Sequence, residues 1–357
     1  MFKTLAPHHP TMFDRLAGLS LVVDDYTLSA ASLETSSDFT RVSTTVALAG
    51  AGETGRGEDV GYGADDQRRF QDRYGDGGLD LAGEYTLAGF SKHLGTVDLF
   101  PEPPGREADR HYRRWAFESA ALDLALRQAD TDLGSALGLT YDPVRFVVST
   151  RLESPARLDE IREVHPGAEF KLDPTEEWDR PFVDAVAERG GVRVLDLKGH
   201  YEGTDVDGSV DPALYRRLFE AFPDAVVEDP AMTETTRPLV EDIAERVSWD
   251  LPITGVESVE ALPFEPDWLN IKPSRFGTVR SLLETVEYCR ERDVRLYGGG
   301  QFELGVGRGQ IQALASLFYP EAPNDVAPGE YNAASLAGDL PTSPLEPPAD
   351  PSGYRWG

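Results

Sequence analysis

The chain has 357 residues and a formal net charge of −29, because 63 Asp and Glu outweigh 34 Lys and Arg. An apolar fraction of 40% argues against global disorder, and the length allows one large α/β barrel or two ordinary domains. The negative charge disfavours nucleic-acid binding, no apolar run reaches the roughly 20 residues of a membrane helix, and the N-terminus lacks a signal-peptide pattern. We therefore expect a soluble cytoplasmic enzyme without a nucleic-acid or membrane partner.

The single cysteine, Cys289, excludes an intrachain disulfide. Among the basic residues, arginine is far more frequent than lysine. Of the basic residues 29 are Arg and only five are Lys, namely Lys3, Lys92, Lys171, Lys198 and Lys272. A chain that uses Arg at most cationic positions keeps a Lys either by drift in an Arg-biased genome or where a compact amine of adjustable pKa is needed.

The same composition predicts a response to salt. Excess acid with scarce Lys suits a salt-loving source, since a solvated carboxylate surface stays soluble in strong brine. We expect the melting temperature to rise with added salt, because counterions screen the repulsion within a chain of charge −29. A salt titration of thermal unfolding checks this, and maximal stability in dilute buffer would contradict it.

Residues 1–140 predict an α+β capping domain. A strand is expected at 44–48, followed by a Gly-rich stretch at 50–63 and later by a long helix at 113–128. The Gly-rich stretch does not close a βαβ unit, so we interpret it as a mobile loop rather than a phosphate-binding loop. Such a segment is suited to lie across the mouth of a barrel.

Residues 141–330 alternate short apolar runs with amphipathic stretches, which is typical of repeated βα units. The runs are rich in Val, Ile and Leu, as in strands covered on both faces, and lie at 145–149, 169–172, 192–197, 225–227, 251–256, 268–271 and 294–297, with an eighth candidate at 324–327. They predict a (β/α)8-type barrel, in which chemistry lies at the C-terminal ends of the strands. The Pro-rich residues 331–357 predict an extended segment that packs back on the capping domain.

Helices between these runs have recognisable ends. Asp211 followed by Pro212 predicts an N-cap and a first turn, and the Gly190-Gly191 pair ends the preceding helix. A later helix at 279–289 places Cys289 on its apolar face, so we expect a small buried side chain there rather than a nucleophile.

Charged side chains recur at the predicted strand ends. In chain order they are Lys171, Asp173, Asp196, Lys198, Glu228, Asp229, Glu257, Lys272 and the run 298–303, which includes Gln301 and Glu303. Carboxylates from several strands that meet at one mouth are the ligands that Mg²⁺ requires, and lysines on opposite sides of such a site can move protons. Each acid alone is better explained as a cap or an ion-pair partner, but the ordered series favours a site.

The series resembles the enolase superfamily, in particular the muconate-lactonizing branch with its o-succinylbenzoate synthases and dipeptide epimerases. The pieces that carry the resemblance are "FKLD" at 170–173, "VLDLK" at 194–198, "VVEDP" at 226–230, "NIKPSRFG" at 270–277 and "GGGQFELGVGR" at 298–308. "FESAALDLAL" at 117–126 is similar to the helix that joins the capping domain of that family to its barrel.

The resemblance implies a lyase or isomerase that abstracts a proton next to a carboxylate and stabilises the enediolate with Mg²⁺, chemistry known for this superfamily. It implies that Asp196 and Glu228 match the first two metal ligands and that Lys272 matches the lysine of the sixth strand. Lys171 matches the first lysine of a Lys-x-Lys pair. The substrate would be a small carboxylate-bearing molecule, and the family favours a homo-oligomer.

Two positions depart from the family pattern. The second lysine of the pair is Asp173, and the third metal ligand, from an Asp-Glu-Ser run, aligns with Val256 in "GVES". Glu257, the next residue, can reach the metal only if the backbone bulges. Asp173 could replace the base or the missing ligand, and Lys198 could act as base or supply an ammonium.

The remaining candidates line the predicted mouth. Arg151 could bind a substrate carboxylate in a bidentate manner, and a surface salt bridge explains it equally well. His200 could transfer a proton near neutral pH, but a solvated loop histidine is the better interpretation. Gln301 and Glu303 border the substrate in the resemblance, and the helix that follows them could receive an anionic group at its N-terminus.

Two alternatives to metal-assisted chemistry remain open. The barrel could have lost catalysis and bind a ligand, as the changes at Asp173 and Val256 suggest. A strand-end lysine, Lys272 or Lys198, could instead form a Schiff base without metal.

Overall fold

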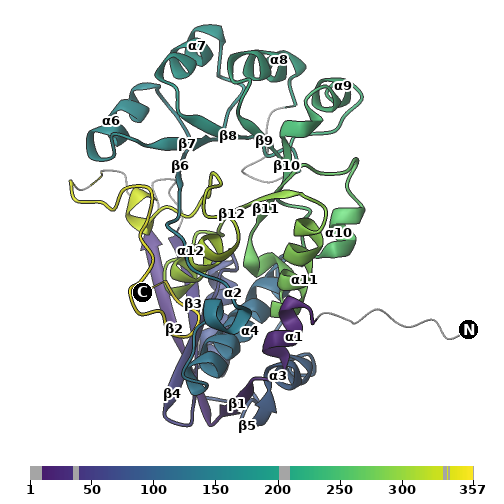
Figure 1. The fold of residues 1–357 in the computed structure, drawn as a ribbon, viewed down its shortest axis with the longest axis vertical. Helices are drawn as coiled ribbons and strands as arrows, with labels where there is room; N and C mark the ends of the chain where they lie inside the picture. Colours follow the sequence, from purple (N-terminus) through teal and green to yellow (C-terminus); the bar gives the residue numbers. More distant parts are fainter. Residues whose placement is uncertain (1–9, 35–39, 201–209, 333–335, 337, 357) are drawn as a thin grey trace, which may run out of the picture.

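The computed structural model describes residues 10–34, 40–200, 210–332, 336 and 338–356. Its N-terminal sheets and the long helix α4 pack beside a curled parallel sheet, and α12 lies between the two (Figure 1). This arrangement confirms the predicted fold class, a (β/α)-barrel with an N-terminal α+β region.

Seven parallel strands form the barrel wall in the order β12-β11-β10-β9-β8-β7-β6. They are β6 (Val147–Thr150), β7 (Glu169–Leu172), β8 (Val192–Asp196), β9 (Val226–Glu228), β10 (Val247–Trp249), β11 (Trp268–Ile271) and β12 (Arg295–Gly298). Most of their buried apolar side chains belong to one large core, and Val194, Val226 and Tyr297 form a second, smaller cluster. Burial of these side chains keeps the register of neighbouring strands fixed. Six of the seven predicted runs coincide with these strands to within two residues at each end.

The prediction for the fifth strand, at 251–256, is wrong. The strand is β10, and Val256 begins the short helix α10 (Val256–Glu260). Pro252 explains the difference, because proline has no N–H for a ladder hydrogen bond and is excluded from a central strand.

The eighth strand is reduced to a single bridge. Asn324 pairs with Phe146 next to β6, the Val147 N–H donates to the carbonyl of Asn324 (2.8 Å), and the Asp325 N–H donates to the carbonyl of Gly298 on β12 (2.8 Å). The Asn324 side chain accepts from the Gly298 N–H (2.7 Å) and donates to the carbonyl of Arg145 (3.0 Å). One buried amide thus connects the first and last strands.

Helices cover the outer face of the curled sheet, as Figure 1 shows for α6 to α9. In the barrel half they are α6 (Ala156–Val164), α7 (Arg180–Arg189), α8 (Pro212–Ala221), α9 (Arg237–Glu241), α10, α11 (Val279–Arg290) and α12 (Val306–Phe318), with 3-10 turns η1 (Ala244–Arg246), η2 (Pro273–Phe276) and η3 (Gly329–Asn332). Asp211 caps α8 as predicted, and Cys289 is fully buried on α11. In the described residues, no helix has the length and hydrophobicity needed to cross a membrane.

The N-terminal region contains two small antiparallel sheets, one of β1 and β5 and the other of β2, β3 and β4. Its elements are α1 (Met12–Ala17), β1 (Ser20–Val23), β2 (Asp25–Glu34), β3 (Thr40–Gly50), β4 (Glu53–Asp59), α2 (Ala64–Tyr74), β5 (Gly83–Thr86), α3 (Leu87–Leu94), α4 (Asp109–Gln128) and α5 (Leu133–Leu137).

Most of the Gly-rich stretch is a strand and not the mobile loop that we predicted. β4 forms a hairpin with β3, and its glycines lie where it crosses α4. A Cβ atom on Gly55 would come within 2.2 Å of the Ala120 carbonyl oxygen, and one on Gly57 within 2.1 Å of the Ala116 carbonyl oxygen. These glycines therefore serve close strand–helix packing.

The C-terminal segment returns along the molecule. Leu345 pairs with Val144 before β6, and the Ser343 N–H donates to Nε2 of the buried His165 (3.1 Å). Further on, the Tyr354 N–H donates to Asp123 on α4 (2.9 Å). The last residues are thereby held against the long helix.

Candidate active site

The predicted strand-end residues meet in a buried cluster of charges at the C-terminal mouth of the barrel. Lys171 on β7 is 2% exposed, and its Nζ donates to Glu228 Oε1 at the end of β9 (2.6 Å). The same ammonium lies 3.3 Å from Asp196 Oδ2 at the end of β8 and 3.6 Å from Asp325 Oδ2. Burial opposes the charge of Lys171, but these carboxylates raise its pKa well above the usual value.

Lys198 lies on the other side of Asp196. Its Nζ donates to Asp196 Oδ2 (2.7 Å) and lies 3.3 Å from Asp173 Oδ2, so one ammonium joins the ends of β7 and β8. Burial tends to raise the pKa of Asp196, yet Lys198 and Lys171 hold it well below the usual range. Lys198 has a φ of 51°, a left-handed conformation that few residues other than glycine adopt and that is often found at functional sites.

The strand prediction missed Asp250, which directly follows β10 and is 1% exposed. Its Oδ2 accepts from Lys272 Nζ (2.8 Å) and from Arg275 Nη2 (3.1 Å), both of which follow β11. Burial tends to raise the pKa of Asp250, but Arg275 and Lys272 lower it. The signal in the sequence was the run Val-Ser-Trp before Asp250, which is short enough to be overlooked beside the longer apolar run that follows.

Asp229 fixes the place of Asp250. The N–H groups of Asp250 and Leu251 donate to the two Asp229 side-chain oxygens, at 2.8 and 2.9 Å. Burial and the Asp250 carboxylate raise the pKa of Asp229 to about 7. This side chain therefore sets the direction in which the chain leaves β10.

Glu228 is the most enclosed of the acids. It accepts from Lys171, from Asn270 Nδ2 (3.3 Å to each oxygen) and from the hydroxyl of Tyr297. Burial raises its pKa to about 8 against the pull of Lys171, and the Asp196 and Asp250 carboxylates contribute to the increase. Burial and the neighbouring carboxylates thus disfavour the charged form of Glu228.

The donor set of Asp196, Glu228 and Asp250 fits a hard divalent cation, since three buried carboxylates end three neighbouring strands. In the structure, lysine and arginine nitrogens contact all three carboxylates. Among the described residues, no group of three acids, histidines or cysteines is arranged to hold a metal ion. The donor chemistry fits Mg²⁺, and the basic side chains occupy the positions that a cation would share.

Glu257, proposed above as a metal ligand, does not join this cluster. It lies exposed in the first turn of α10, because that segment is helical and not a strand. Val256, which begins the same helix, is likewise not at a strand end.

Arg151 and His200 lie at strand ends but apart from the buried acids. Arg151 follows β6 and is exposed, and within the described residues it makes no hydrogen bond or ion pair. The His200 ring lies 5.4 Å from the Trp249 ring of β10, and burial lowers its pKa.

Gln301 and Glu303 are buried and contact protein groups. Glu303 Oε1 accepts from the Gln301 N–H (2.6 Å), and Arg308 lies 3.5 Å from Glu303 Oε2. The N-terminus of α12 also carries an anion, but an internal one. The Glu58 carboxylate of β4 accepts from the N–H groups of Leu304 (2.7 Å) and Gly307 (2.9 Å), so this helix end is filled from the N-terminal region.

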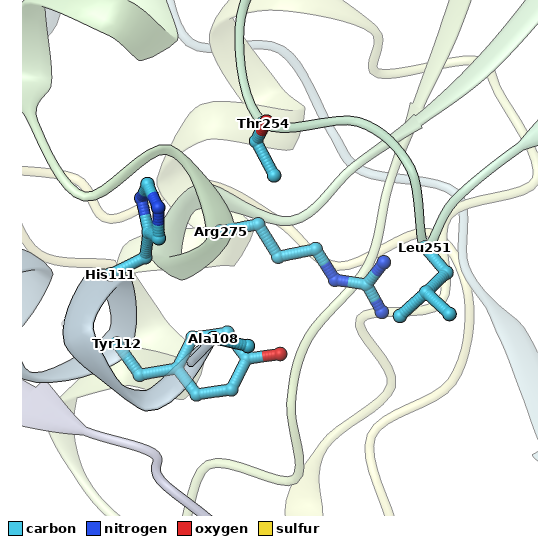
Figure 2. A pocket seen from close by; sticks show the side chains of 6 residues that line it. All are labelled: Ala108, His111, Tyr112, Leu251, Thr254 and Arg275. Carbon is cyan, nitrogen blue, oxygen red and sulfur yellow. The ribbon is translucent and has the colours of Figure 1, made fainter. Parts of the chain in front are cut away.

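A small pocket of about 50 Å³ lies beside this site, between the start of α4 and the segments after β10 and β11. Figure 2 shows the Arg275 side chain extending across it, with Tyr112 on one side and Leu251 near the guanidinium. The lining is Ala108, His111, Tyr112, Leu251, Thr254 and Arg275.

Asp109, at the start of α4, belongs to a second buried cluster in the N-terminal region. It is 3% exposed, and its Oδ1 has no hydrogen-bond partner. Asp59 nearby accepts from Arg113 Nε (2.8 Å) and from the Gly61 N–H (2.9 Å). Burial and the Asp59 carboxylate raise the pKa of Asp109 to about 6.

We therefore expect Asp109→Asn to stabilise the protein at pH 8. A carboxyl whose pKa is raised in the folded state adds its full contribution to folding stability at pH values below its unfolded pKa, which is near 4. This contribution is lost as the pH rises through the folded pKa of about 6. Asp109→Asn should therefore raise the free energy of unfolding by up to about 3 kcal/mol at pH 8, and no increase is expected at pH 4. Urea unfolding at both pH values measures it, with the exposed Asp65→Asn as control; an equal effect at both would contradict the assignment.

Comparisons with known proteins agree with this architecture. The model of DUF8230, a domain of unknown function, matches in two parts, its N-terminal domain at residues 14–136 and its C-terminal domain at 140–333. An o-succinylbenzoate synthase of Bacillus subtilis is 26% identical over 250 residues, covering 66% of this chain and 63% of the relative. An N-succinylamino acid racemase of an Amycolatopsis species is 30% identical over 236 residues, covering 61% and 60%. The chain thus spans less than two thirds of the length of either relative.

Among solved structures, a dipeptide epimerase from Methylococcus capsulatus complexed with Mg and the dipeptide L-Arg-D-Lys superimposes with a TM-score of 0.68. It is 19% identical, and the match covers 89% of this chain and 93% of the epimerase. This similarity shows the fold.

Proposed function

Because the chain belongs to the DUF8230 family and has the fold of the enolase superfamily, we propose that it is a lyase or isomerase that abstracts a proton next to a carboxylate of a small molecule. The observation that supports this is the meeting of three buried carboxylates, Asp196, Glu228 and Asp250, between lysines that come from different strands.

In this proposal Asp196, Glu228 and Asp250 are the residues that would hold Mg²⁺. The bound ion would offset the negative charge that develops on the substrate carboxylate oxygens as the neighbouring carbon loses its proton. Asp229 and Asn270 keep two of these acids in place through hydrogen bonds to the backbone of Asp250 and to Glu228. Asp250 takes the third ligand position that the sequence pattern assigned to Val256.

Lys272 Nζ, at the end of β11, moves the proton, and Asp250 orients its amine (2.8 Å). Lys198, from β8 on another side of the mouth, supplies the second amine, in place of the family lysine whose position is Asp173. Asp173 and Asp196 hold that ammonium between them. Lys171 neutralises Glu228 and Asp196. Because these acids raise its pKa, its amine stays protonated and does not act as a base.

The substrate class follows from relatives that are named for N-succinylamino acids, o-succinylbenzoate and dipeptides, all of which carry a carboxylate. The exposed Arg151 at the mouth is the candidate for a second, distal carboxylate.

Exchange of the substrate α-proton in D₂O tests this function. Purified protein with Mg²⁺ is incubated with a panel of N-succinylamino acids and dipeptides, and loss of the α-proton signal is followed by NMR. Exchange with at least one substrate, abolished by Asp250→Asn and by Asp196→Asn, is expected. No exchange across the panel, with Mg²⁺ bound, would contradict the function.

One observation favours a second candidate, a barrel that works without metal. The ammonium groups of Lys171, Lys198 and Lys272 already contact all three carboxylates. Calorimetry separates the two candidates. Mg²⁺ binding that Asp196→Asn and Glu228→Gln both remove supports the first, whereas no binding, with a borohydride-trapped adduct of a keto acid on Lys272 or Lys198, supports the second.

A further inference from the structure

Gln301, in the segment after β12, connects the N-terminal region with the charged cluster. Its side chain is buried, and its Nε2 donates to the hydroxyl of Tyr62 (3.1 Å), which lies between β4 and α2. Its Oε1 accepts from Arg275 Nε (2.7 Å) and Nη2 (3.0 Å). This orientation of the amide satisfies both neighbours, because the oxygen faces donors and the nitrogen faces an acceptor.

The backbone of Gln301 is fixed as firmly as its side chain. Arg41 on β3 is 1% exposed and donates to the carbonyl of Gln301 (2.9 Å). Arg41 also donates to the carbonyls of Val60 (2.7 Å) and Gly61 (2.8 Å), and its guanidinium stacks on the Tyr62 ring, 4.5 Å from the centroid. Tyr62 and Gln301 are therefore parts of one rigid unit that spans the two regions.

Arg275 consequently divides its guanidinium between two acceptors. One edge faces the neutral Gln301 oxygen, while Nη2 also reaches the charged Asp250 Oδ2 (3.1 Å). A guanidinium and a carboxylate prefer a bidentate pair. Here the amide holds the Nε–Nη2 edge of the guanidinium, and the contact with Asp250 runs through Nη2. The pocket on the other side of Arg275, lined largely by carbon atoms of Leu251, Tyr112 and Ala108, leaves the side chain room to turn (Figure 2).

We propose that Gln301 is a positioning residue, which keeps Arg275 from a full ion pair with Asp250 and so leaves that carboxylate available to Lys272 and to a divalent cation. In the same arrangement the Arg275 donors set the direction of the amide oxygen, and the Tyr62 hydroxyl accepts from the amide nitrogen and anchors the side chain. This inference rests on the proposed function of Asp250 as a ligand. It makes the N-terminal region a determinant of cation affinity at a site to which it contributes no ligand.

Two substitutions at one position should shift cation binding in opposite directions. Gln301→Leu removes the competing acceptor, so Arg275 closes on Asp250, and the Kd for Mg²⁺ is expected to rise about tenfold. Gln301→Glu draws the guanidinium away from Asp250, and the Kd is expected to fall. Tyr62→Phe should raise the Kd by a smaller factor than Gln301→Leu, because the amide can then turn.

Calorimetry with MgCl₂ on the full chain measures these shifts. Gln310→Leu is the matched control, since Gln310 is an equally buried amide that joins α12 to the Arg56 carbonyl of β4 (2.7 Å) without contacting Arg275. Weaker binding in both Gln301→Leu and Gln301→Glu would indicate general damage to the site and would overturn the proposal.

Crystal structures of the metal-free variants decide the question independently of metal binding. Arg275 should form a bidentate pair with Asp250 in Gln301→Leu and should turn to the introduced carboxylate in Gln301→Glu. An Arg275 side chain that stays in place in both variants would refute the inference. A wild type that binds no Mg²⁺, with Arg275 moving as expected, would refute the metal site and leave the positioning role intact.

Discussion

Replacing Lys272 with Ala is expected to lower turnover by at least about a thousandfold while the protein stays folded. The ammonium of Lys272 is held by Asp250 at 2.8 Å, and Arg275 remains to neutralise this carboxylate when the lysine is removed. The effect therefore falls on proton transfer rather than on the fold.

Lys272→Arg sharpens the test, because arginine keeps the charge beside Asp250 but cannot give up a proton near neutral pH. The D₂O exchange assay and thermal unfolding are measured on both variants, with Lys92→Ala, an exposed lysine on α3, as control. Exchange at the wild-type rate in Lys272→Arg would exclude this lysine as the proton-transfer group.

Glu58→Ala is expected to lower the free energy of unfolding by about 3–5 kcal/mol. It removes the carboxylate that accepts from the N–H groups of Leu304, Gly305 and Gly307 at the start of α12, and it leaves the buried N–H of Gly307 without this acceptor. It also removes the partner of the Ser43 hydroxyl (2.7 Å).

Glu58→Gln retains the shape and one acceptor, so a loss of about 1–2 kcal/mol is expected. Urea unfolding provides the measurement, and Glu53→Ala, an exposed residue of the same strand, provides the control. Similar stabilities for Glu58→Ala and the control would show that water satisfies this helix end.

Much of the fold could be predicted from the sequence because its periodic signals are local. Val, Ile and Leu runs mark buried strands, and Asp211-Pro212 and Gly190-Gly191 mark helix ends, which depend on the nearest turn alone. The fifth strand was misplaced because an apolar run interrupted by Pro252 is longer than the true three-residue strand. The more apolar segment after β10 was therefore predicted as the strand, although its proline cannot donate a hydrogen bond to a neighbouring strand.

The candidate site was predictable where a residue lies in the last two positions of a strand, as for Lys171, Asp196 and Glu228. Asp250 was lost with its strand, and Arg275 and Tyr62 matter only through partners that are distant in the chain. The glycines of β4 illustrate the same limit. Gly55 and Gly57 suggest a loop when read in sequence, but their reason is the backbone of α4, more than 50 residues away.

The bridge at Asn324 has a consequence for the motions of the barrel. A barrel wall whose first and last strands are joined through two residues, Asn324 and Asp325, has its lowest local stability there, so the first opening of the native state should part β6 from β12. Asp325, on this seam, lies 3.6 Å from the ammonium of Lys171. Each local opening between β6 and β12 would move the Asp325 carboxylate away from Lys171. The net charge around Lys171 would therefore change each time these two strands separate.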